Sequence, residues 1–162
     1  MITVVPIGQP ELRVDELRRL RDELARIFNT GVDLIEPIPL SFQAYDPIRD
    51  QYRASLLIDS LPEDEIVLGI TGVDLFAPHL NFVFGEANPV LKRAIISTFR
   101  LDRKNPLFLE RVIKEAVHEI GHLLGLGHCP DPRCIMHFSN TIQDTDLKGP
   151  GFCKNCLLYL KE

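Results

Sequence analysis

Residues 118–128 read His-Glu-Ile-Gly-His-Leu-Leu-Gly-Leu-Gly-His. His118 and His122 stand four residues apart, so on a helix both imidazoles project from one face and can reach a single metal ion. Gly125 is a residue type that readily takes the left-handed conformation ending a helix, which would return His128 to the same ion. Three histidine ligands leave one position of a tetrahedral zinc open, as in a catalytic zinc site.

The helix expected around these histidines supports that interpretation. Asn105 can cap it, Pro106 suits its first turn, and apolar residues recur at helical spacing up to residue 124. Glu119 follows the first histidine and is the candidate general base. A His-Glu-x-x-His pentapeptide also arises by chance, and paired histidines can be ordinary surface residues. The glycine and the third histidine at their required offsets favour the metal site.

Four cysteines follow the last histidine: Cys129, Cys134, Cys153 and Cys156. Four thiolates on tight turns suit a tetrahedral structural zinc, whose sulfur ligands close the site to water. Two disulfides are the alternative. The chain begins without a recognisable secretory signal, so we expect reduced thiols, a cytoplasmic location and zinc rather than disulfides. His128 or His137 could replace a sulfur as ligand, and the sequence leaves that partition open.

The extended histidine motif, the cysteine that follows it, the Cys-Ile-Met at 134–136 and the final Cys-x-x-Cys together resemble the archaemetzincin family of zinc metallopeptidases. The resemblance covers residues 118–156. It implies a metzincin-like α/β fold, with a twisted mixed sheet, an active-site helix and a small zinc-bound C-terminal subdomain. It also implies two zinc ions, one catalytic and one structural. The implied roles are catalytic zinc ligands for His118, His122 and His128, structural zinc ligands for Cys129, Cys134, Cys153 and Cys156, and a methionine turn beneath the site for Met136.

These roles predict a zinc-dependent peptidase that hydrolyses peptides or small proteins with Glu119 as its base, and the resemblance makes cleavage at amino termini plausible. Phe138 is a departure, because some related metallopeptidases carry a tyrosine two residues after the turn methionine. A phenylalanine offers no hydroxyl to the transition state from that position. The alternative is a non-catalytic zinc protein that binds peptides or other partners on the same framework. Glu119 favours the enzyme, since a purely metal-binding scaffold needs no base there.

Length and composition fit a single domain. The 162 residues are 45% hydrophobic, enough to bury a substantial core. We expect one metallopeptidase domain over residues 1–162, with the sheet and active-site helix in about 1–128 and the cysteine subdomain in 129–162. The net charge of -5 argues against nucleic acid or an anionic membrane as the main partner. No apolar run reaches membrane-spanning length, and the oligomeric state is not predicted.

The N-terminal part predicts a β-α-β unit with parallel strands, because strands at 2–7 and 32–35 flank a helix at 10–28. The other expected strands are 66–70, 80–84 and 95–101, and the other expected helices are 48–60, whose first half could be a loop, 139 or 140 to 147, and 152–160. Segment 80–84 is the candidate edge strand for an extended substrate, because Pro78, Gly85 and Pro89 surround it. An ordinary core strand is the alternative.

Overall fold

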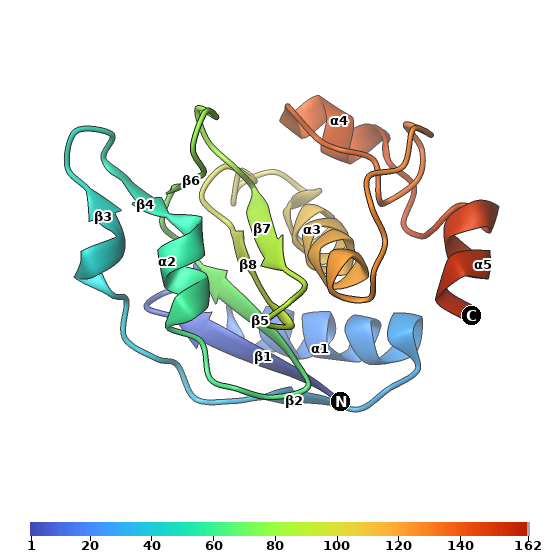
Figure 1. Cartoon of the computed structure of the whole chain (residues 1–162), viewed down its shortest axis with the longest axis horizontal. Helices are drawn as coiled ribbons and strands as arrows, with labels where there is room; N and C mark the ends of the chain where they lie inside the picture. Colours follow the sequence, from blue (N-terminus) through green and yellow to red (C-terminus); the bar gives the residue numbers. More distant parts are fainter. Residues whose placement is uncertain (162) are drawn as a thin grey trace.

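The computed structural model describes residues 1–161, so only the last residue of the expected subdomain 129–162 lies outside the described part. A five-stranded mixed sheet lies between helices (Figure 1). Its strands in spatial order are β2 (Val32–Leu34), β1 (Ile2–Ile7), β5 (Ile66–Thr71), β8 (Arg93–Ser97) and β7 (Gly85–Asn88). The first four are parallel, and β7 runs antiparallel to β8 at one edge. The predicted mixed α/β fold is confirmed.

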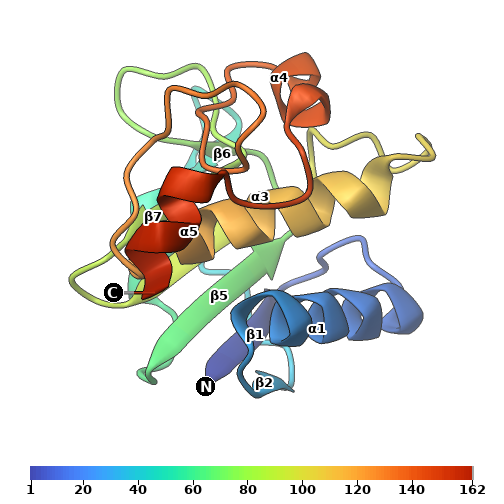
Figure 2. The same cartoon turned by 90° about the vertical axis from the view of Figure 1, so that its right-hand side faces the viewer.

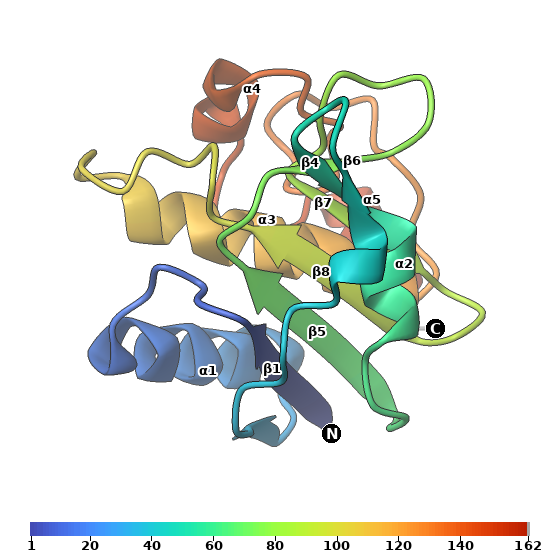
Figure 3. The same cartoon turned by 90° about the vertical axis from the view of Figure 1, so that its left-hand side faces the viewer.

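Helices cover both faces of this sheet. The helices α1 (Val14–Phe28) and α3 (Phe108–Leu123) pack side by side on one face, as Figure 2 shows. The short α2 (Ala54–Asp59) packs on the other face, in contact with β7 and β8, and lies toward the viewer in Figure 3. The sheet separates two hydrophobic cores, and consecutive residues of β1 point into different ones. Val4 packs in the core with α1 and α3, and Val5 packs in the core with α2. This explains the unbroken apolar run of β1, which is typical of a strand covered on both faces.

The predicted β-α-β opening is confirmed, because Ile2 of β1 pairs in parallel with Val32 of β2. Its helix begins at Val14 rather than at residue 10, since Glu11 has a left-handed φ of 59° that no helix accommodates. The active-site helix likewise begins later than predicted, at Phe108. Asn105 still contributes near its start, accepting a hydrogen bond from the backbone N–H of Leu107 at 2.8 Å.

A second, three-stranded sheet is an element that the sequence did not predict. It consists of β3 (Tyr45–Asp46), β4 (Gln51–Arg53) and β6 (Leu75–Phe76), preceded by the 3-10 helix η1 (Phe42–Ala44). The expected helix at 48–60 is therefore wrong in its first half. The backbone N–H of Tyr52 donates to Asp74 at 2.8 Å, so pairing with a segment distant in sequence overrides the helical pattern.

The expected strand at 80–84 is wrong. This segment belongs to a loop over residues 77–84, which we call the rim loop, and the edge strand β7 begins only at Gly85. His79 takes a left-handed φ of 70°, which interrupts an extended backbone. The expected strand at 95–101 is shifted: β8 ends at Ser97, and the backbone turns where Leu101 N–H donates to the carbonyl of Thr98.

The chain after the histidines packs against α3 from outside the sheet and carries two short helices, α4 (Ile142–Leu147) and α5 (Lys154–Lys161), seen on the right of Figure 1. The cap of α4 is Thr141, whose hydroxyl accepts from the N–H of Asp144, rather than the predicted Ser139 or Asn140. The last helix starts two residues later than predicted. Among the described helices, none combines the length and apolar character that crossing a bilayer requires.

Candidate metal centre

The three histidines of the motif converge on one point. His118 and His122 project from the last turns of α3, and His128 returns to them after the helix has ended. Their ring centroids are 4.7 to 5.5 Å apart. One nitrogen of each ring lies within 4.8 Å of one nitrogen of the other two. The predicted clustering of this triad is thus present in the fold.

Backbone carbonyls orient two of the rings. The Nδ1 atom of His118 lies 2.7 Å from the carbonyl oxygen of Ile135, and Nδ1 of His122 lies 2.8 Å from that of Leu126. A carbonyl oxygen only accepts, so each Nδ1 carries the hydrogen and each Nε2 keeps a free lone pair. The two Nε2 atoms are 3.1 Å apart. Two lone pairs held this close are suited to a shared metal ion.

Burial favours the neutral form of all three rings. It lowers the pKa of His118 well below the usual histidine value and also lowers the pKa of His122 and of His128. Imidazole coordinates a metal only when neutral, so the environment already favours the ligating state. Nitrogen donors of this kind fit zinc.

The turn that returns His128 depends on Gly125, as the sequence predicted. Its φ is +100°, a conformation that L side chains rarely adopt, and a side chain there would also meet the Tyr159 hydroxyl at 3.0 Å. The helix end is fixed from outside by Lys92, whose ammonium donates to the carbonyl of Leu123 at 2.9 Å. Such a cation at the C-terminal end of a helix also interacts favourably with the helix dipole.

Glu119 lies at the wall of a cleft of about 750 Å³ that the three histidines also line. Its side chain is buried, and its Oε2 has no hydrogen-bond partner among residues 1–161. Burial raises its pKa well above the usual glutamate value, and the neighbouring charge of Glu115 raises it further. Strand β7 approaches closely here: a Cβ on Gly85 would lie 3.0 Å from Cγ of Glu119. Gly85 therefore allows the sheet edge and the helix to form one cleft.

Two further carboxylates, which were not among the predicted site residues, line the cleft. Glu115 lies one turn before Glu119 on α3, and Glu86 lies on β7. Burial raises the pKa of each. The Glu-x-x-x-Glu spacing was a usable signal for Glu115, because residues four apart share a helix face. Glu86 could have been identified only if the edge strand had been predicted at residues 85–88.

Met136 packs against α3 at Gly121, the residue before His122. It is fully buried, and a Cβ added to Gly121 would lie 2.5 Å from its sulfur. Its carbonyl accepts the N–H of Cys129 at 2.9 Å. This contact ties the methionine to the residue that follows His128.

Phe138 stands over the metal centre without a polar group. Its ring centroid lies 5.0 Å from that of His128, and the side chain is partly exposed at the cleft. His137 turns away, with Nδ1 2.8 Å from the carbonyl oxygen of Cys129. Among the described residues, the ligand cluster around the sulfurs consists of the four cysteines and does not include His137.

The four cysteines also come together. Their four sulfur atoms all lie within 4.8 Å of one another. The sulfurs of Cys129 and Cys153 are 3.8 Å apart, and so are those of Cys134 and Cys156. A disulfide needs about 2.05 Å, so these are free thiols. The arrangement has the sulfur-only composition of a closed tetrahedral zinc site.

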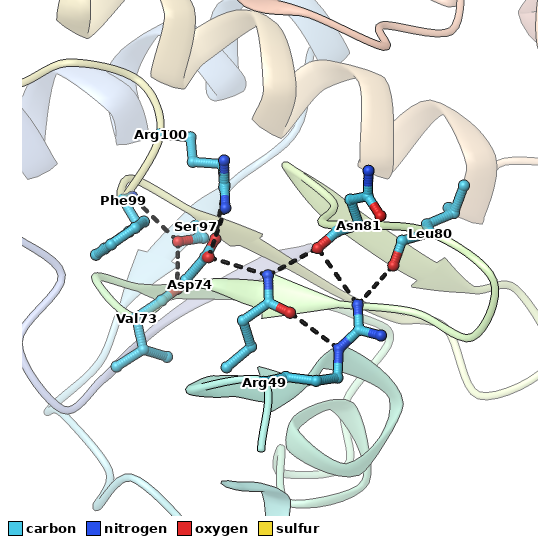
Figure 4. Close-up of polar contacts among 9 residues, drawn as sticks. Arg49, Val73, Asp74, Leu80, Asn81, Ser97, Phe99 and Arg100 are labelled. Carbon is cyan, nitrogen blue, oxygen red and sulfur yellow. Dashed lines mark hydrogen bonds and ion pairs between the residues drawn. The ribbon is translucent and has the colours of Figure 1, made fainter. Parts of the chain in front are cut away.

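The rim loop forms the wall of the cleft opposite the helix, and side chains from β4 and the preceding turn hold it (Figure 4). Arg49 donates to the carbonyl oxygen of Leu80 at 2.6 Å and to the side chain of Gln51 at 2.9 Å. Gln51 in turn donates to the carbonyl oxygen of Asn81 at 2.8 Å. These carbonyls therefore bind side chains rather than a neighbouring strand.

Asp74 extends this network toward β8. It accepts two hydrogen bonds of 2.8 Å from Arg100, a planar fork-to-carboxylate pair, and a third from Gln51 at 3.0 Å (Figure 4). The Arg100 guanidinium also lies 4.0 Å from the ring centroid of Phe82, a residue of the rim loop. The rim loop is thus fixed by hydrogen bonds and by a cation–π contact.

The fold and the site together are those of a zinc metallopeptidase. On a mixed α/β sheet, one helix carries two histidines and a glutamate, a glycine turn brings in a third histidine, and a methionine packs against the helix. The model of Peptidase family M54 matches residues 42–162, and the chain belongs to this family of archaemetzincins. An archaemetzincin of Pyrococcus furiosus is 44% identical, over 100% of this chain and 93% of its own length. One of Archaeoglobus fulgidus is 45% identical, over 85% of this chain and 86% of its own.

Solved structures agree with the sequence relatives. The crystal structure of the Archaeoglobus fulgidus archaemetzincin complexed with malonate has a TM-score of 0.90 at 39% identity, covering 98% of this chain and 99% of its own. That of the Methanopyrus kandleri archaemetzincin has a TM-score of 0.90 at 37% identity, covering 99% and 93%. The predicted family and the predicted zinc metallopeptidase activity are thus confirmed.

Proposed function

We propose that His118, His122 and His128 hold the catalytic zinc and that Glu119 is the general base. The observation that carries this proposal is the convergence of three imidazoles beside a buried carboxylate in one cleft. When bound there, zinc supplies a Lewis acid that lowers the pKa of water and polarises the carbonyl of the scissile bond.

Glu119 would move the proton in this hydrolysis. Its Oε2, which has no other partner among the described residues, accepts the proton of the attacking water as the oxygen bonds to the carbonyl carbon. The protonated carboxyl then donates this proton to the leaving nitrogen as the C–N bond breaks.

We propose that the substrate is an extended peptide that pairs with β7. This strand has β8 on one side only, so its other edge presents free backbone groups, and Gly85, Glu86 and Ala87 line the cleft. A peptide added there as a further strand would run between the sheet edge and the histidines. The position differs from the segment at 80–84, which belongs to the rim loop that leads into β7.

We further propose that the four cysteines hold a second, structural zinc, and that residues from 129 onward form a C-terminal subdomain around it. The sulfur-only donor set supports zinc of the closed kind. In this proposal Met136 forms the turn beneath the catalytic site, and the chain binds two zinc ions in all.

Zinc stoichiometry and peptide cleavage test these assignments together. We expect two zinc ions in the intact protein, one in the His118→Ala, His122→Ala variant, and cleavage of a peptide library only by the intact protein. Glu119→Gln should keep both metals and lose cleavage. Glu110→Gln, on the exposed side of the same helix, is the matched control and should keep both properties. Full cleavage by Glu119→Gln would overturn the assignment of the base.

A further inference from the structure

A second groove, of about 550 Å³, opens beside the metal centre next to the cysteine cluster. Cys129, Cys153 and Cys156 line it, together with Asn155 and Tyr159 of α5. A zinc ion held among four sulfurs at bond lengths of about 2.3 Å fills only a small part of this volume. The groove therefore has room for a further ligand.

This groove is continuous with the catalytic cleft. Residues 125–128 line both, so this short segment forms the partition between them. Two of its four residues are glycines, and His128 is exposed. Tyr159 stands at the same junction, because its hydroxyl lies 3.0 Å from the position of a Cβ on Gly125. A peptide that lies over the partition therefore contacts the cleft and the second groove together.

Gly127 leaves the space over this partition open. Its φ lies outside the left-handed region, unlike that of Gly125, so the backbone does not require a glycine here. A Cβ placed on Gly127 meets no atom within 4 Å, so packing does not require one either. The fold would accept a larger side chain, but that side chain would occupy the passage from the cleft to the groove.

The proposed path of the substrate leads to this passage. Strand β7 ends at Asn88, and Pro89 after it still lines the cleft. The turn that follows reaches the C-terminal end of α3, where Lys92 donates to the carbonyl of Leu123 at 2.9 Å. The partition follows this helix end directly, and α5 lies beside it (Figure 2). A peptide paired with β7 that continues past Asn88 is therefore directed toward the second groove.

We propose that the second groove binds the part of the peptide substrate that extends beyond β7, so that the protein prefers extended peptides to short ones. This inference rests on the proposed function, because it takes the substrate to be a peptide paired with β7. Strand β7 has four residues and can pair with about four residues of a peptide, at roughly 3.3 Å per residue. Residues further along the peptide would contact Tyr159 and Asn155. The phenol ring and the amide offer apolar area and hydrogen bonds that suit many peptide sequences.

Binding of peptides of different lengths tests this proposal. A peptide of about five residues, enough to cover β7, is compared with two peptides of about ten that extend it at one end or the other. Fluorescence anisotropy measures their affinity for zinc-loaded Glu119→Gln. Extension at one end should tighten binding about tenfold, and extension at the other should have little effect, since the groove lies beyond one end of β7. Equal affinity for all three peptides would overturn the proposal.

Two substitutions in the Glu119→Gln background should remove this gain. Asn155→Trp places a large ring in the groove, and Gly127→Leu closes the passage over the partition. In each, the longer peptide should bind no more than about twofold better than the shorter one. Leu158→Trp is the matched control and should keep the full gain, because Leu158 is half-exposed on the same helix and outside the groove lining.

Each affinity ratio is taken within one variant, so a substitution that weakens both peptides alike leaves the ratio unaffected. A full gain from extension in both Asn155→Trp and Gly127→Leu would show that the extension binds elsewhere, and the proposal would be wrong.

The same peptides separate this inference from the proposed function. Cleavage of the short peptide by the intact protein tests the catalytic assignments, whereas the ratio of the two affinities tests the groove. If the intact protein cleaves no peptide while extension still tightens binding, the catalytic assignments fail and the groove stands. If Glu119→Gln cleaves the peptides, the role of Glu119 as base fails, and the length preference is then read from the KM values.

Discussion

Gly121 shows how a single residue constrains the metal centre, because it lies between the two helical histidines and directly above Met136. A Cβ at this position would lie 2.5 Å from the methionine sulfur. Gly121→Ala should therefore force Met136 or the helix to move and destabilise the protein by about 1–3 kcal/mol. It should also weaken zinc binding by the histidines, since His122 is the next residue. Thermal unfolding and chelator competition measure the two effects.

Gly127 provides the matched control at the residue scale, since no atom lies within 4 Å of a Cβ placed there. Gly127→Ala should leave both unfolding and zinc affinity nearly unchanged. Equal effects of the two substitutions would contradict the proposed contact between Gly121 and Met136.

Single residues were predictable from the sequence where the information was local. The three histidines, Glu119 and Gly125 lie within eleven consecutive positions, so helical geometry and one glycine turn were enough to predict that they meet. The buried Lys148, whose ammonium lies 3.8 Å from a carboxylate oxygen of Glu115, could not be predicted in this way. It is a lone lysine after a short helix, and only the packing of α4 on α3 brings it to Glu115, 33 positions earlier in the chain.

At the scale of elements, the contact between α3 and α4 depends on the paired hydrogen bonds of Arg111 with Asp146. These hydrogen bonds hold the pKa of Asp146 below its usual value. Asp146→Asn should cost about 1–3 kcal/mol near neutral pH, because Arg111 stays buried with a weakened partner. The pKa of Asp146 is lower in the folded than in the unfolded state. The intact protein therefore has its full extra free energy of unfolding over Asp146→Asn above the unfolded-state pKa, about 4. It loses this difference as the pH falls through the folded-state pKa.

Denaturant unfolding of both proteins across acid pH measures this difference. Asp22→Asn is the control, because its pair with Arg21 is exposed and surface pairs contribute little. A difference for Asp146→Asn that stays constant with pH would contradict the assigned linkage.

The rim loop is the element that sequence reasoning placed wrongly. Alternating Leu80, Phe82 and Phe84 has the period of a strand, and this pattern predicted an edge. The carbonyls of residues 80 and 81 instead accept hydrogen bonds from Arg49 and Gln51, about thirty positions away. Partners this distant leave no local signal, whereas the parallel core strands were predictable from their continuous apolar runs.

Arg49 should accordingly control how firmly this loop is held. It donates to the carbonyl of Leu80 and lies over the Phe76 ring at 4.1 Å. Arg49→Ala should lower the local opening free energy by about 1–2 kcal/mol, which corresponds to roughly five- to thirtyfold faster hydrogen exchange. The amides of Leu80 and Val83, both hydrogen-bonded, report this directly. Arg18→Ala, on the exposed face of α1, should leave their exchange unchanged, and slow exchange in both variants would refute the anchoring role.

At the scale of the whole molecule, the cysteine cluster and the histidine triad share one stretch of backbone. Cys129 follows His128 directly, its N–H donates to the carbonyl of Met136, and the neighbouring carbonyl of Ile135 orients His118. Loss of a metal at the cysteines should therefore disturb the histidines, because the backbone at Cys129 also carries His128 and is hydrogen-bonded to the segment that orients His118.

Replacing Cys153 and Cys156 by serine should then weaken zinc binding at the histidines about 10–100-fold, the range found when groups that orient metal ligands are lost. Chelator competition measures the affinity of the remaining zinc, and thermal unfolding measures the accompanying loss of stability. Leu158→Ser, on the exposed side of α5, is the control for a change in the same helix. An unchanged affinity at the histidines would mean that the sheet and α3 fix the catalytic centre by themselves.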